Sequence, residues 1–186
     1  MKTLKILSFA FFIFLFAISM NNISAQKKAH KYVGAKKCGM CHKSKKIGKQ
    51  YKIWEKTKHA QAYKTLQTKK ADKIAADKGF KTKAVDTPEC LECHAPTYNV
   101  KASLIGKRFK IENGVQCETC HGPGSDYKSK KIMKNQDKAV KNGLKMYTDP
   151  GSELCVTCHN KKSPTFKEFN FKKYWAKIEH PVPKKK

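Results

Sequence analysis

The amino-acid sequence predicts a domain of helices and loops that folds around a non-protein core. Three observations predict it. Eight cysteines fall into four identical motifs, Tyr51 to Leu66 repeats apolar residues at helical spacing, and the lysine-rich chain is poor in Leu, Ile and Val after residue 25. Because aliphatic side chains are too few to fill the interior, another group must fill it.

The N-terminal segment is typical of a secretory signal. Two lysines precede an apolar run from Ile6 to Met20, and small residues end the segment at Ala25. We expect residues 1–25 to be removed and residues 26–186 to form one domain, soluble in the periplasm. An uncleaved membrane anchor is the less favoured alternative, because the run is short for a span of about 20 apolar residues.

The four motifs use every cysteine of the chain. In each, two cysteines are separated by two residues and followed at once by histidine. Both sulfurs can then bond the vinyl carbons of one porphyrin while the histidine ligates the iron, which predicts four covalently bound haem c groups. The motifs are Cys38-Gly-Met-Cys41-His42, Cys90-Leu-Glu-Cys93-His94, Cys117-Glu-Thr-Cys120-His121 and Cys155-Val-Thr-Cys158-His159.

Zinc, disulfides and a redox-active cysteine pair are the competing interpretations of these motifs. Zinc sites do not require histidine after every second cysteine, disulfide frameworks have irregular spacings, and redox pairs occur singly. Each explains one copy and none explains four. Four haems leave only about 40 residues per haem, so we expect the macrocycles to pack closely and form the core.

The number of histidines limits the iron ligands. Four irons have eight axial positions, and the chain has seven histidines, four of which are proximal ligands within the motifs. His59 is the strongest distal candidate, since it shares an apolar helical stripe with Ala62 and Leu66. His180 lies in an extended, proline-flanked tail that can reach an iron, and His30 is the third candidate.

One distal position is left without a histidine. Met133 and Met146 are the free methionines that can fill it, and a methionine would raise the potential of that haem. A lysine would first have to lose its proton, which is unfavourable near neutral pH. An open position would instead bind a small ligand.

Three segments also carry a family resemblance. They are Lys36 to His42 followed by Trp54 to Leu66, the second motif, and the stretch from Gly114 to Gly124 around the third motif. These segments resemble the tetrahaem cytochrome c554 family. The resemblance implies a mainly α fold with little β, in which helices and loops wrap around four closely packed haems.

The resemblance also implies three bis-histidine haems and one five-coordinate haem. In the family the open haem is the second, which here is bound by Cys90, Cys93 and His94, and His59 corresponds to a family distal ligand. The other family distal histidines lie after the third motif and before the fourth, where this chain has none. His30 and His180 would have to substitute for them from the two ends of the chain.

The charge of the chain bears on its partners. Lys and Arg number 41 against 14 Asp and Glu, so a basic surface would attract acidic redox proteins or an anionic membrane face. The alternative is that the lysines only keep a haem-rich particle soluble. Nucleic acid is excluded as a partner because export removes it from reach.

The sequence therefore predicts an electron carrier that passes electrons between redox partners through its haems. The alternative is an enzyme that reduces or oxidises nitric oxide, nitrite or hydroxylamine at the open haem. A gas sensor is the least favoured class because no signalling domain is attached. The sequence contains no carboxylate pair, nucleophile triad or phosphate-binding loop, so any catalysis would occur at an iron.

Overall fold

The computed structural model describes residues 29–147 and 153–180. The predicted signal peptide, residues 1–25, lies outside them. Within the described residues the chain is mainly α-helical, and the one β-bridge pairs Tyr32 with Ile105 in parallel orientation. The predicted mainly α fold with little β is confirmed. No helix in these ranges is long and apolar enough to cross a membrane.

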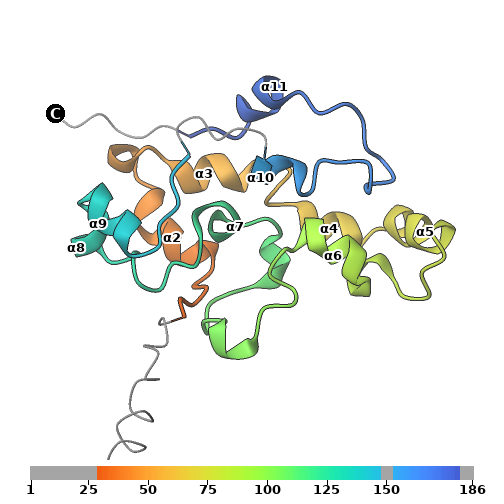
Figure 1. Ribbon diagram of the computed structural model, residues 1–186, viewed down its shortest axis with the longest axis horizontal. Coiled ribbons are helices and arrows are strands. Elements are labelled where there is room, and N and C mark those ends of the chain that lie inside the picture. Colours follow the sequence, from red (N-terminus) through yellow and green to blue (C-terminus); the bar gives the residue numbers. More distant parts are fainter. Residues whose placement is uncertain (1–28, 148–152, 181–186) are drawn as a thin grey trace, which may run out of the picture.

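The helices are short and follow one another closely along the chain (Figure 1). The α-helices are α2 (Ala35–His42), α3 (Gln50–Glu55), α4 (Ala62–Leu66), α5 (Lys69–Asp77), α6 (Pro88–His94), α7 (Cys117–His121), α8 (Lys130–Met133), α9 (Gln136–Lys141), α10 (Glu153–Val156) and α11 (Phe171–Trp175). The 3-10 turns are η2 (Lys45–Ile47), η3 (Ala84–Asp86), η4 (Ala102–Leu104) and η5 (Ile111–Asn113).

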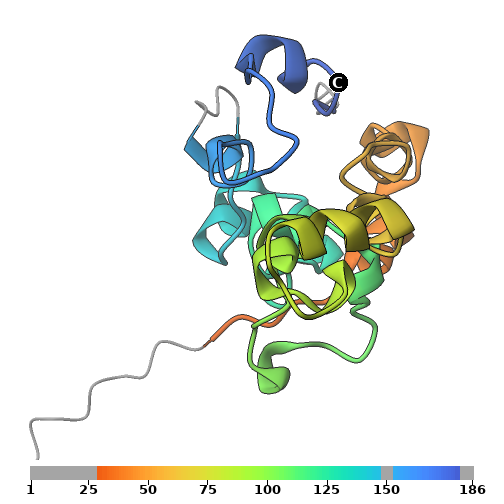
Figure 2. The ribbon, with the colours of Figure 1, turned by 90° about the vertical axis from the view of Figure 1, so that its right-hand side faces the viewer.

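Helix α7 occupies the middle of the molecule in Figure 1. On one side of it α2 packs against α3 and α7, and on the other side α4 packs against α5 and α6. The segment 153–180, which carries α10 and α11, runs along one side of the molecule and is drawn in blue in Figure 2.

Helix α5 begins and ends where its sequence predicts. The Thr68 hydroxyl accepts a hydrogen bond from Ala71 N at 3.2 Å and caps the first turn. The chain leaves the helix at Gly79, whose φ of 85° is in the region that favours glycine. The helix covers Lys69–Asp77, and the turn that follows it reaches Gly79.

The helix predicted from Tyr51 to Leu66 is broken, and this expectation was wrong. The chain ends α3 at Glu55, turns through residues 56–61 and resumes in α4. The Thr57 side chain donates to Trp54 O at 2.7 Å, and Val115 N donates to His59 O at 3.0 Å. Both bonds compete with the continuing helical ladder, so His59 lies in a turn.

The apolar core of the described residues is small. Leu66 and Leu144 are its buried aliphatic side chains larger than alanine, and Tyr51 and Tyr127 are its buried aromatic ones. Such a core buries little apolar surface for a chain of this length. This agrees with the expectation that another group fills the interior. The remaining buried apolar residues are Ala35, Ala60, Ala71, Ala75, Ala84, Ala95 and Ala139.

Candidate haem sites

Each Cys-X-X-Cys-His motif lies on a short helix or starts in one. The first motif ends α2, the second ends α6, and the third is α7 itself. The fourth starts in α10 and continues through a turn in which His159 N donates to Cys155 O at 2.9 Å. Residues four apart share one face of a helical turn, so the first cysteine and the histidine of a motif point to the same side.

The eight cysteines form no disulfide, and thiols of different motifs lie together. A hydrogen bond between Cys38 and Cys117 raises the pKa of Cys38 and lowers that of Cys117. Burial, together with the charge of Cys158, raises the pKa of Cys93 to about 12. The first motif therefore lies beside the third, and the second beside the fourth.

The thiol pKa values also bear on the competing interpretation as a redox pair. Burial raises the pKa of Cys120 to about 11, and it raises those of Cys90 and Cys155 as well. A redox-active pair needs a lowered thiol pKa and an exposed nucleophile. Most of these cysteines instead have a raised thiol pKa.

Two pairs of imidazoles approach each other to a distance that fits an iron ion. The ring centroids are 5.9 Å apart for His121 and His180, and 6.0 Å apart for His59 and His159. Two metal–nitrogen bonds of about 2 Å, with half an imidazole behind each nitrogen, span about 6 Å. Each pair joins one motif histidine to one predicted distal histidine, so the residues present fit a bis-histidine haem at the third and fourth motifs.

Five histidines have Nδ1 in a hydrogen bond to an oxygen. A haem-ligating imidazole coordinates iron through one ring nitrogen and donates a proton from the other, so this pattern leaves Nε2 for the metal. The oxygens belong to a carboxylate, a side-chain amide and three backbone carbonyls. The pairs are His30 with Asp126 Oδ2 (2.9 Å), His42 with Gln50 Oε1 (3.1 Å), His94 with Ala62 O (2.8 Å), His121 with Lys145 O (2.8 Å) and His180 with Ile178 O (3.0 Å).

Burial favours the neutral form of His59, His121 and His159. It lowers the pKa of His59, of His121 and of His159, and a neighbouring imidazole lowers the first two further. A metal binds neutral imidazole and competes with the proton for the same lone pair. At neutral pH these side chains are therefore in the form that ligates iron.

The turn that carries His59 is fixed by the segment just before the third motif. Val115 N donates to His59 O, and the Trp54 indole N–H donates to Val115 O at 2.8 Å. Gly114 allows the close approach, because a Cβ there would lie 2.7 Å from His59 O and its φ is 67°. Sequence reasoning placed His59 on one continuous helix, whereas the structure places it, half-buried, in a turn between α3 and α4.

Glu118 and Gln116 bind the first motif to the third, and sequence reasoning did not single them out. The Glu118 side chain, 2% exposed, accepts hydrogen bonds from Gly34 N (2.7 Å) and Gly124 N (2.7 Å). Gln116 Oε1 accepts one from Ala35 N at 3.0 Å. The stretch from 114 to 124, quoted for the family resemblance, was the available signal.

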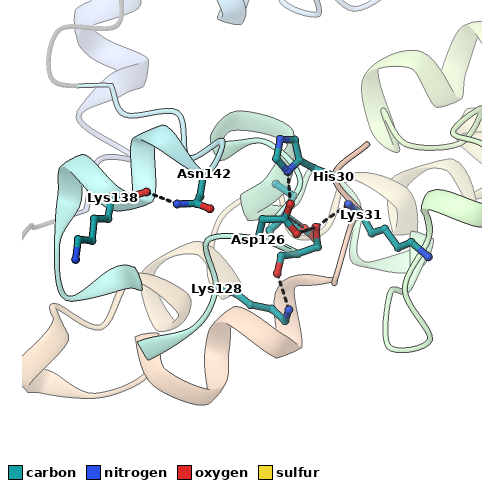
Figure 3. Close-up of polar contacts among 9 residues, drawn as sticks. His30, Lys31, Asp126, Lys128, Lys138 and Asn142 are labelled. Carbon is teal, nitrogen blue, oxygen red and sulfur yellow. Dashed lines mark hydrogen bonds and ion pairs between the residues drawn. The ribbon is translucent and has the colours of Figure 1, made fainter. Parts of the chain in front are cut away.

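The remaining predicted ligands lie in two places. His30 bonds to Asp126 beside the end of α9, as Figure 3 shows. Met133 and Met146 pack against the apolar cluster of Tyr127, Ala139 and Leu144. This packing gives both methionines a structural role in the described residues.

An open surface hollow of about 660 Å³ adjoins the fourth motif. The His159 imidazole stacks on Phe169 at 4.9 Å, and Phe169 stacks on Tyr174 at 5.3 Å. The apolar, aromatic lining suits a planar macrocycle. The lining residues are Val156, His159, Asn160, Lys161, Phe166, Glu168, Phe169 and Phe171.

Comparison with known proteins defines the class of this molecule. Residues 37–122 match the family described as cytochrome c554 and c-prime. The chain is also 32% identical over 100 residues to cytochrome c-554 of Nitrosomonas europaea, a match that covers 52% of this chain and 40% of that protein. The chain thus spans about two fifths of the length of that curated relative. No solved structure matches the chain significantly.

These matches make the chain a c-type cytochrome, a class that carries covalently bound haem c. The resemblance to the cytochrome c554 family that the sequence predicts is confirmed over residues 37–122.

Proposed function

We propose that the chain is a periplasmic tetrahaem cytochrome that transfers electrons between redox partners. The observation that carries the proposal is the presence of two imidazole pairs, about 6 Å between ring centroids, each with a Cys-X-X-Cys-His histidine as one member. Haem c supplies an iron that accepts and releases one electron. The protein supplies the ligands, their orientation and the spacing between the sites.

Each motif would bind one haem through its two cysteines. The proximal ligands would be His42, His94, His121 and His159. In the third and fourth haems the distal ligands would be His180 and His59, which follows from the imidazole pairs.

The placement of the motifs supports transfer between haems. Cys38 lies beside Cys117, and Cys93 lies beside Cys158. Sulfurs in contact put the edges of their porphyrins close together, so each such pair would exchange electrons rapidly. The charges of Cys155 and Cys158 act on the buried Cys120, so the third motif also lies near the fourth. This contact connects the two pairs of motifs.

The basic surface supports acidic partners. Long-range attraction would raise the rate of association with an acidic redox protein or an anionic membrane face and would weaken as salt is added. We expect the rate of electron exchange with an acidic partner to fall with ionic strength. A rate independent of salt would assign the lysines to solubility alone.

Chemistry at one open haem is a second candidate function, and the ligand count favours it. Seven histidines serve eight axial positions, and among the described residues neither His42 nor His94 belongs to an imidazole pair. His30 can complete one of these two haems. The family resemblance points to His94 as the proximal ligand of the open one, where nitric oxide, nitrite or hydroxylamine could bind.

The test uses the purified holoprotein. Intact mass should show four added haems, and low-temperature electron paramagnetic resonance of the oxidised protein should show one high-spin haem in about four. Fewer than four haems would refute the tetrahaem assignment. Four low-spin haems would show that a methionine, lysine or other group closes the last site, which leaves electron transfer alone.

A further inference from the structure

Among the described residues, His30 is the histidine whose Nδ1 is bonded to a carboxylate. The distance from Nδ1 to Asp126 Oδ2 is 2.9 Å, and the Asp126 side chain is 20% exposed. The other four bonded imidazoles have neutral oxygens as partners. A carboxylate accepts the Nδ1 proton more strongly than a neutral oxygen does.

Hydrogen bonds of the neighbouring residues hold the contact between His30 and Asp126 in place. Lys31 N donates to Ser125 Oγ at 2.9 Å, and Ser125 N donates to Lys31 O at 3.0 Å, which fixes residue 31 opposite residue 125. The Ser125 hydroxyl also donates to Asp126 Oδ1 at 2.9 Å. Figure 3 shows the Asp126 side chain beside the His30 imidazole. The residues next to the 31–125 pair, His30 and Asp126, are thereby brought together.

The His30 imidazole packs beside Gly143, which has no side chain. A Cβ built on Gly143 would lie 3.4 Å from His30 Nε2, and the φ of Gly143 is 99°. The same Cβ would lie 3.5 Å from Cε1 and 3.6 Å from Cδ2, so a side chain there would pack against the imidazole ring. Nδ1 is thus engaged with a carboxylate, which leaves Nε2 as the ring nitrogen that can bind a metal.

We propose that Asp126 is a positioning residue that fixes His30 as a distal ligand and lowers the reduction potential of the haem that His30 ligates. The inference rests on the proposed tetrahaem function. Hydrogen bonding to the carboxylate increases the electron donation of the imidazole, and stronger donation stabilises ferric over ferrous iron. The reduction potential of that haem is therefore lower than it would be if the His30 imidazole were hydrogen-bonded to a neutral oxygen. A lower potential at one haem biases the direction in which electrons flow through the four haems.

The experiment compares the holoprotein with its Asp126→Asn variant by spectroelectrochemical titration. Asparagine keeps an oxygen for Nδ1–H but removes the charge. We expect one of the four potentials to rise while the other three stay. Asp77→Asn is the matched control, because Asp77 is an exposed partner of Lys73 on α5 and its loss changes the net charge equally. Ser125→Ala keeps the carboxylate and loosens it, so a smaller rise is expected.

A further variant, His30→Ala, tests whether His30 ligates an iron separately from whether Asp126 lowers the potential of that haem. If its paramagnetic resonance spectrum gains no high-spin haem, His30 is not a ligand and the ligand assignment fails. If it gains one, and Asp126→Asn leaves all four potentials where they were, only the role of Asp126 is overturned. Equal upward shifts of all four potentials in Asp126→Asn and Asp77→Asn would likewise overturn it, since they would report net charge.

Discussion

Gly34 N donates a 2.7 Å hydrogen bond to the carboxylate of Glu118, and this bond joins the start of α2, the helix of the first motif, to the interior of the third motif. The same carboxylate accepts bonds from Val33 N and Gly124 N. Three backbone groups from two distant parts of the chain therefore converge on one side chain. Because backbone N–H groups buried without a partner are costly, the side chain stabilises this junction.

We expect Glu118→Ala to lower the free energy of unfolding by about 2–4 kcal/mol, since it leaves three backbone donors without their acceptor. Chemical denaturation of the holoprotein measures it. The control is Glu112→Ala, because Glu112 is exposed and lies nearby on η5. Equal stability of the two variants would show that the junction does not depend on the carboxylate.

The same residue predicts a dependence of stability on pH. Burial raises the pKa of Glu118, although the hydrogen bonds from Val33, Gly124 and Gly34 act in the opposite direction. A carboxyl whose pKa is raised on folding contributes stability that is present below its unfolded pKa, about 4.3, and is lost as the pH rises through the folded pKa.

The comparison with Glu118→Gln isolates this contribution. We expect the difference in free energy of unfolding, wild type minus variant, to fall as the pH is raised from about 4, the ordinary range of a glutamate pKa, and then to level off. A difference that rises with pH would mean that the hydrogen bonds outweigh burial and lower the pKa instead.

The sequence predicted what depends on local patterns. The motif spacing and the shortage of aliphatic residues were both visible in the sequence itself. It could not predict bonds between distant segments, such as that of His30 with Asp126, which are 96 residues apart in the chain. The helical stripe through His59 showed that this side chain faces inward, but the bond from Val115 N, which breaks that helix, depends on tertiary contact.

His59→Met is expected to raise the reduction potential of one haem. In the proposed assignment His59 is the distal ligand opposite His159, and a methionine ligand favours ferrous iron more than an imidazole does. Redox titration should show one of the four potentials moved upward. An unchanged titration would contradict the assignment of His59, and His30→Met offers a comparison in which a different haem should move.

Gly114→Ala tests how the backbone positions His59. The Cβ would lie 2.7 Å from His59 O, and the φ of 67° is strained for alanine, so we expect a cost of about 1–3 kcal/mol or more and displacement of the turn. Gly79→Ala is the matched control, because Gly79 also has a positive φ, 85°, but no atom lies within 4 Å of its Cβ position. Both variants should lose stability in denaturant titration. Only Gly114→Ala should also convert a low-spin haem to high spin, because only it moves a ligand; a low-spin spectrum retained in that variant would show that His59 does not depend on this contact for its position.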